Sequence, residues 1–126
     1  MAITEGLRAT TGIRVHEQDT AEAMGSGDVP VLATPRVLAL AEAATVAAVA
    51  EHLDEERTTV GTDVSLTHSA ATPVGARVQA EATLRSVDGK HLLFDVTVTH
   101  NERTVAQGTV ARAVVNRRRF LAAATE

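Results

Sequence analysis

The chain has 126 residues, of which 44% are hydrophobic and 22% charged, and its formal net charge at pH 7 is -4. This size and composition predict one compact domain over residues 1–126, large enough to bury a core without metal or disulfide support. Because the chain has no cysteine, disulfide frameworks, thiolate nucleophiles and Cys-ligated metals are excluded, and we expect a cytoplasmic protein. No apolar run approaches about 18 residues, so no membrane span is expected.

The N-terminal quarter of the sequence shows only weak periodicity. Residues 2–18 alternate enough to predict a first strand. Residues 20–33 contain two glycines and Pro30 and have no regular pattern, so an irregular loop is expected there.

The next segment, residues 35–53, is predicted to be one long helix. It is rich in Ala and contains no Gly and no internal Pro. Thr34 followed by Pro35 is a typical helix start in which Thr34 serves as the N-cap, and the charged residues 54–57 end the helix. The apolar residues that define its inward stripe are Leu38, Val46, Val49 and Leu53.

After the helix, the apolar residues alternate with polar ones as far as residue 116, which predicts antiparallel strands. The expected strands cover residues 63–68, 77–85, 92–98 and 104–116. The expected turns are residues 72–75, Asp88-Gly89 and Asn101-Glu102, and a change of parity near Gly108 indicates a bulge. Together these elements predict an α+β fold in which a sheet of about five strands wraps one long central helix.

Glu42 is a charged residue on the predicted apolar stripe of the helix, four residues after Leu38 and four before Val46. Burial of an unpaired carboxylate costs several kcal/mol. Three interpretations remain open: a carboxylate at the edge of the stripe that reaches water, one held by a buried arginine, or one that performs chemistry.

His68 is a similar exception on a strand, because it shares its side with Val64 and Leu66. It is either a satisfied core histidine or a catalyst. If the helix and the strand pack together, or meet across a dimer axis, Glu42 and His68 would share one dry space suited to acid/base or nucleophilic chemistry.

Thr34 and the arginines also allow two interpretations each. Thr34 lies about 12 Å along the helix from Glu42, so it either caps the helix or points its hydroxyl toward substrate or water. Arg112 shares its strand side with Val110 and Val114. It forms a salt bridge to an acidic neighbour, contacts the substrate or is the partner of Glu42. The run from Arg117 to Arg119 is either a solvated strand end or a contact to a phosphate-bearing ligand.

Several classes of ligand are not expected. The remaining histidines lie in unrelated segments without metal-ligand spacing, and no phosphate-binding glycine loop is present, so we expect no metal and no cofactor. With only two aromatic residues, Phe94 and Phe120, and an acidic net charge, the chain is not expected to bind nucleic acid.

Four stretches of the sequence together carry a resemblance to a known family. They are VLATPRVLALAEAA (31–44), GTDVSLTHSAATPVG (61–75), LRSVDGK (84–90) and QGTVARAVV (107–115). Over roughly residues 30–120, the chain closely resembles the fluoroacetyl-CoA thioesterase family of hot-dog-fold proteins. The resemblance implies a catalytic triad of Thr34, Glu42 and His68, with Gly61 near the thioester carbonyl and Arg112 beside the site.

The resemblance implies a homodimeric acyl-CoA thioesterase that needs no cofactor and releases a short-chain acid and CoA. In that scheme Glu42 attacks the thioester or activates water, His68 transfers the proton and Thr34 orients the reacting groups. The family's fluoroacetyl enzyme has a gate lined with aromatic side chains, whereas residues 21–41 contain none here. Selectivity for fluoroacetyl is therefore not part of the expectation, and the identity of the short acyl group stays open.

Three other functions are compatible with the same residues. A non-catalytic module could bind the acyl-CoA thioester without turnover. A hot-dog hydratase acting on an enoyl thioester is a further enzymatic alternative. A purely structural dimer would leave Glu42 and His68 without a purpose.

Overall fold

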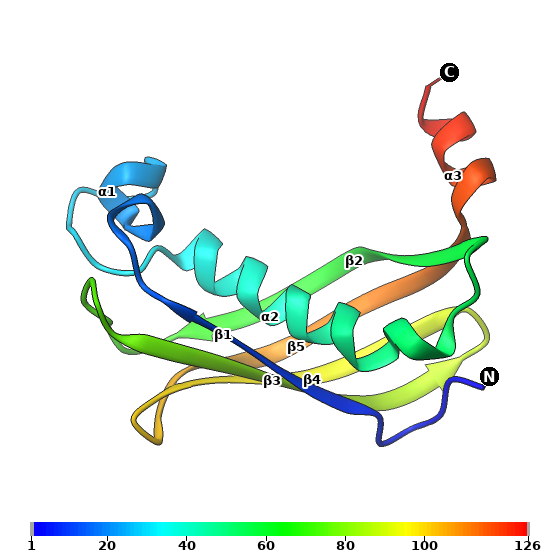
Figure 1. The fold of residues 1–126 in the computed structure, drawn as a ribbon, viewed down its shortest axis with the longest axis horizontal. Coiled ribbons are helices and arrows are strands. Elements are labelled where there is room, and N and C mark those ends of the chain that lie inside the picture. The colour runs from blue at the N-terminus through cyan, green and yellow to red at the C-terminus, as the bar shows by residue number, and fades with distance from the viewer. Residues whose placement is uncertain (1, 126) are drawn as a thin grey trace.

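The structure, a computed structural model that describes residues 2–125, consists of one long helix lying across one face of an antiparallel sheet (Figure 1). The helix is α2 (Thr34–Val49). The strands are β1 (Arg8–Arg14), β2 (Arg57–His68), β3 (Arg77–Asp88), β4 (His91–His100) and β5 (Arg103–Asn116). The predicted α+β fold, with one helix against a five-stranded sheet, is confirmed.

The order of strands across the sheet is β1-β3-β4-β5-β2. Although β2 directly precedes β3 in the sequence, it pairs with β5 and forms an edge of the sheet. The far edge of β2 therefore has no partner strand within residues 2–125. This edge strand carries both Gly61 and His68.

The face of α2 that packs on the sheet differs from the predicted stripe. Its buried residues include Val37, Leu40, Ala41, Ala44 and Ala48. Of the predicted stripe, Val49 is buried as expected, whereas Val46 is 45% exposed and Leu38 is half-buried. The prediction was wrong at Val46 because Ala, Val and Leu fill every side of this helix, so the sequence offers little contrast between faces.

The predicted bounds of the helix are close to the observed ones. Helix α2 ends at Val49 and continues as a short 3-10 turn, η2 (Ala50–His52). The charged segment that follows was expected to lie between helix and strand, but β2 already begins at Arg57, six residues before the predicted start.

The N-terminal segment is more regular than its sequence suggests. The weakly predicted first strand is β1, and a 3-10 turn, η1 (Glu17–Asp19), follows it. The expected irregular loop contains a one-turn helix, α1 (Ala21–Met24), in which the Thr20 hydroxyl accepts a hydrogen bond from the Ala23 amide at 3.1 Å. This hydroxyl cap satisfies an otherwise unpaired amide of the first turn.

Two of the three predicted turns are confirmed and one is displaced. Asn101 and Glu102 both have positive φ, as a tight hairpin turn requires, and residues 72–75 form the expected turn. The hairpin between β3 and β4 turns at Gly89 and Lys90, because Asp88 still pairs with His91.

The bulge predicted near Gly108 lies three residues earlier on the same strand, at Val105. Gly108 pairs in register with Leu66 and Val96, and the irregularities fall at Thr62 on β2 and Val105 on β5. A side chain at residue 108 would overlap the neighbouring β2 backbone at Ser65. The glycine therefore reports a close approach of two strands, which produces the same local signal as a bulge.

The end of the chain also differs from the prediction of a strand exit. Arg117, Arg118 and Arg119 begin helix α3 (Arg117–Ala124), whose N-cap Asn116 accepts a hydrogen bond from the Arg119 amide at 3.0 Å. Figure 1 shows α3 projecting away from the sheet at the end of β5. Within residues 2–125, no helix combines the length and apolar character needed to cross a bilayer.

Candidate functional site

The first residue of α2 and the last residue of β2 form a direct contact. Thr34 Oγ1 and His68 Nδ1 lie 2.8 Å apart, so a hydrogen bond holds the imidazole ring. The predicted N-cap role of Thr34 is wrong, because Ala33 is the N-cap and Thr34 already belongs to the helix. Its hydroxyl is thus directed to the histidine and not to the helix amides.

The second ring nitrogen of His68 is buried and has no hydrogen-bond partner within the described chain. Buried polar atoms are normally paired, and an unpaired one calls for an explanation such as a catalytic role or a bound group. With Nδ1 engaged by Thr34, Nε2 is the ring atom that remains available to a ligand.

Contacts from the preceding loop fix the start of α2. The Asp19 backbone carbonyl accepts a hydrogen bond from the Ala33 amide at 2.9 Å, and the Asp19 carboxylate accepts one from Arg36 Nε at 3.1 Å. The Leu32 amide donates to the Thr72 carbonyl at 2.9 Å, which ties this loop to the segment after His68. These contacts hold the backbones that carry Thr34 and His68 in a fixed relation.

Glu42 and Arg112 form a second cluster. Arg112 Nη1 donates to Glu42 Oε2 at 3.0 Å, while its Nε and Nη2 donate to the Thr59 hydroxyl and carbonyl at 2.9 and 3.1 Å. The Arg112 side chain is 7% exposed and that of Glu42 is 33% exposed. Glu42 therefore lies at the border of the buried face and not on the inward stripe that the sequence predicted. A buried arginine holds its carboxylate.

Gly61 completes this second cluster. A Cβ at this position would overlap Glu42 Oε2 and lie 3.3 Å from Arg112 Nη1. Because the residue is glycine, the carboxylate can lie directly against the backbone of β2. The structure thus places Gly61, Glu42 and Arg112 together, and of the interpretations left open for Arg112 it shows the partner of Glu42.

The two clusters remain apart within one chain. Thr34 and Glu42 are separated by about 12 Å along α2, and Gly61 and His68 by about 20 Å along β2. No hydrogen bond or ion pair connects the clusters in the part of the chain that the structure describes. The expected convergence of Glu42 and His68 does not occur inside a single protomer.

A cavity of about 360 Å³ lies beside Thr34 and His68. Its walls come from the segment between α1 and α2 and from the loop after β2. The lining residues are Ala21, Ser26, Gly27, Asp28, Val29, Val31, Leu32, Thr34, His68, Ser69, Ala70 and Ala71. None of them is aromatic, so the wall is formed by small side chains and a single carboxylate.

Two structural contributors to these clusters were absent from the sequence predictions. The Thr59 hydroxyl accepts a hydrogen bond from Arg112. Because Thr59 lies beside another threonine at the start of β2, nothing in the sequence singled it out. Asp19 is 7% exposed and pairs with Arg36, but nothing in its own segment distinguishes it from a surface carboxylate. Both contacts join residues that are far apart in the sequence, so no spacing motif could have indicated them.

The sequence of this chain is similar to a known protein family. Residues 15–118 match the family described as fluoroacetyl-CoA-specific thioesterase. The fluoroacetyl-CoA thioesterase of Streptantibioticus cattleyicolor is 38% identical over 90 residues, which are 71% of this chain and 65% of that protein. The match thus spans slightly less than two thirds of that relative's length.

Solved structures match over nearly the whole chain. The fluoroacetyl-CoA thioesterase FlK superposes with a TM-score of 0.92 at 30% identity, covering 99% of this chain and 97% of that one. A thioesterase superfamily member from Thermus thermophilus has a TM-score of 0.88 at 23% identity, covering 96% and 90% of the two chains. The second similarity shows that the two chains share a fold.

Proposed function

This chain belongs to the fluoroacetyl-CoA-specific thioesterase family, and we propose that it hydrolyses a short-chain acyl-CoA thioester to the free acid and CoA. The observation that carries the proposal is the Thr34–His68 hydrogen bond, which leaves a buried and unpartnered Nε2 beside a cavity. Such an imidazole is oriented at one nitrogen and available for proton transfer at the other.

The proposed chemistry divides the work between the two clusters. Glu42 supplies the carboxylate, either as the nucleophile on the thioester carbonyl or as the base that activates water. Arg112 orients this carboxylate through the 3.0 Å hydrogen bond. The carbon–sulfur bond then breaks, and His68 Nε2 delivers a proton to the leaving thiolate while Thr34 holds the ring. If Glu42 is the nucleophile, water then hydrolyses the acyl–Glu42 anhydride to the free acid. In either route a proton released from the attacking water replaces the one that His68 gave up.

We propose that the working unit is a homodimer formed through the open edge of β2. Two β2 strands pairing antiparallel about an axis at Ser65 would set Gly61 of one protomer opposite His68 of the other, since each is the third paired position from Ser65 when the bulged Thr62 is left out. Glu42 and Arg112 of one protomer would then face Thr34 and His68 of its partner. An unpaired edge of 12 residues favours such pairing.

The proposed acyl group is small and differs from fluoroacetyl. The cavity beside His68 has about 360 Å³, near the lower end of ligand pockets. Its walls lack the aromatic side chains that the family resemblance associates with the fluoroacetyl gate. Met24 is 43% exposed on α1 and is a flexible apolar side chain in the same segment.

The direct test is release of free CoA thiol from a panel of acetyl-, fluoroacetyl-, propionyl- and butyryl-CoA. Glu42→Gln and His68→Ala should each lower kcat by at least about a hundredfold. Glu51→Gln and His91→Ala are the matched controls, because both residues are exposed and lie outside the two clusters. Wild-type rates in both test variants would overturn the site assignment, and tight binding without thiol release would instead identify a binding module.

A mixing experiment tests the shared site. If Glu42 of one protomer acts with His68 of the other, the mixed dimer of Glu42→Gln and His68→Ala keeps one intact site. Random exchange of the two inactive variants should then restore roughly a quarter of wild-type activity. No restoration, with exchange verified by mass spectrometry, would place each site within one chain.

We also propose a cytoplasmic location. The chain contains no cysteine, which suits a reducing compartment where disulfides are not used. Cell fractionation with the tagged full chain tests this proposal.

A further inference from the structure

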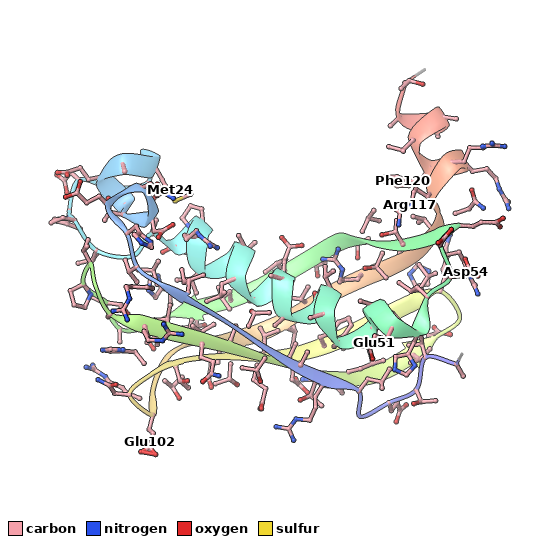
Figure 2. All side chains as sticks on the ribbon, viewed as in Figure 1. Met24, Glu51, Asp54, Glu102, Arg117 and Phe120 are labelled. Carbon is pink, nitrogen blue, oxygen red and sulfur yellow. The ribbon has the colours of Figure 1, made fainter. Side chains whose placement is uncertain are left out.

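Helix α3 gathers positive charge at one end of an acidic protein. Arg117, Arg118 and Arg119 are all exposed, whereas the chain as a whole has a net charge of -4. No ion pair joins any of the three to a carboxylate within residues 2–125. Figure 2 shows Arg117 and Phe120 at the base of α3, where the helix leaves the sheet.

Two hollows flank this helix. The larger, of about 780 Å³, is lined by Arg117, Arg118 and Arg119 together with Glu55, Glu56, Asn116 and Leu121. On the other side, a hollow of about 380 Å³ is lined by Lys90, Arg119 and Phe120 with residues 114–116.

The larger hollow has a net positive charge although two acidic residues line it. Arg117 donates its amide to the Glu56 carbonyl at 2.8 Å and its Nε to the Glu55 carbonyl at 3.4 Å. These bonds engage backbone oxygens, so the guanidinium charges are not neutralised by carboxylates. The three arginines exceed the two glutamates of this hollow by one positive charge, and Lys90 in the smaller hollow adds another. This arrangement suits a ligand with several phosphates.

The cluster lies at a suitable distance from the proposed reaction centre. Arg117 is five residues beyond Arg112 along the line of β5, or about 17 Å at ordinary strand rise. The extended phosphopantetheine arm of CoA spans about 16 Å at ordinary bond lengths. A thioester held at Glu42 and Gly61 could thus place its pyrophosphate at the base of α3.

We propose that α3 binds the nucleotide end of CoA, an inference that rests on the proposed acyl-CoA thioesterase function. The guanidinium groups of Arg117, Arg118 and Arg119 bind the pyrophosphate and the 3′-phosphate. Phe120, which is 43% exposed, offers its ring to the adenine. Arginine suits this role because its planar donors match phosphate oxygens.

The test compares substrates with and without the nucleotide. The triple variant Arg117→Gln/Arg118→Gln/Arg119→Gln is expected to raise KM for acetyl-CoA about tenfold, since each exposed charge contact contributes modestly. Its kcat should be unchanged, and its kcat/KM for acetyl-pantetheine should equal that of the wild type. The dependence of the acetyl-CoA KM on salt should weaken.

A matched control removes the same charge elsewhere. Arg14, Arg77 and Arg103 are exposed and lie near the opposite end of the sheet, so Arg14→Gln/Arg77→Gln/Arg103→Gln tests the effect of net charge alone. This control should keep the wild-type KM for acetyl-CoA. Thermal melting and sedimentation of both triple variants verify folding and oligomeric state.

Binding measured without turnover separates this inference from the proposed function. Calorimetry with 3′,5′-ADP should show about tenfold weaker binding to the α3 variant than to the control. If no thioester is hydrolysed but this difference appears, the thioesterase function fails and the nucleotide site stands. Equal losses with acetyl-CoA and acetyl-pantetheine, equal effects in both triple variants, or an altered oligomeric state would overturn the nucleotide site.

Discussion

Replacing Gly61 by Ala probes the geometry on which the proposed site depends. The added methyl group would overlap Glu42 Oε2 and lie 3.3 Å from Arg112 Nη1. The carboxylate is the group that can yield, because it is 33% exposed whereas the Arg112 side chain is 7% exposed. We therefore expect Glu42 to move outward and its hydrogen bond to Arg112 to break.

The magnitude follows from that lost bond. Hydrogen bonds to charged groups contribute about 1.5–3 kcal/mol, and replacing glycine at a compatible backbone position returns about 0.4–1 kcal/mol. The free energy of unfolding should fall by roughly 1–2 kcal/mol, which corresponds to a decrease in Tm of about 4–8 °C for a chain of this length. A carboxylate displaced by about 1 Å should also lower kcat about a hundredfold.

The assay is a double-mutant cycle with Glu42→Ala, measured by urea unfolding. Once the Glu42 carboxylate is gone, the methyl group has room, so Gly61→Ala should then be neutral or stabilising by up to about 1 kcal/mol. The two substitutions should be coupled by about 2 kcal/mol. If Gly61→Ala is equally destabilising in both backgrounds, the proposed collision with Glu42 is refuted.

Three further substitutions test other contacts. Thr34→Ala should lower kcat by tenfold to a hundredfold because the His68 ring loses its 2.8 Å partner, whereas Thr34→Ser should restore most of the rate; equal losses in both would deny the hydroxyl a role. Arg112→Gln should reduce the free energy of unfolding by about 3 kcal/mol, since it removes a buried partner of Glu42 and Thr59, and an unchanged urea midpoint would contradict this. Gly108→Ala should cost more than about 3 kcal/mol or prevent folding, because no side-chain rotation relieves an overlap with the Ser65 backbone; a folded variant with wild-type Tm would show that the strands can separate there.

Local patterns in the sequence were sufficient for the types of the five strands and the long helix, but not for the short helices α1 and α3. The alternation along β3 and β4 and the helix across the Ala-rich segment follow from periodicity and propensity, which act over a few residues. The Asn101-Glu102 turn was equally predictable, since few residue pairs tolerate positive φ. The exceptional polar residues Glu42 and His68 were visible for the same reason, as breaks in a local apolar pattern.

The partners of those residues were decided by the tertiary structure. Thr34 contacts His68 across 34 residues of sequence, and Glu42 contacts Arg112 across 70. The pairing of β2 with β5 is likewise non-local and leaves β2 at the edge. Periodicity assigns a residue to a face of its own element but does not state which element will cover that face.

The inward face of α2 shows this limit most clearly. With Ala, Val and Leu on every side, the helix has no polar face of its own to direct it, and Val46 lies outward while Ala41 and Ala44 are fully buried. The helix can approach the sheet closely where its side chains are smallest, so packing selected the alanine face. Sequence alone therefore determined which elements form and which residues are exceptional, whereas packing between distant elements decided which residues meet.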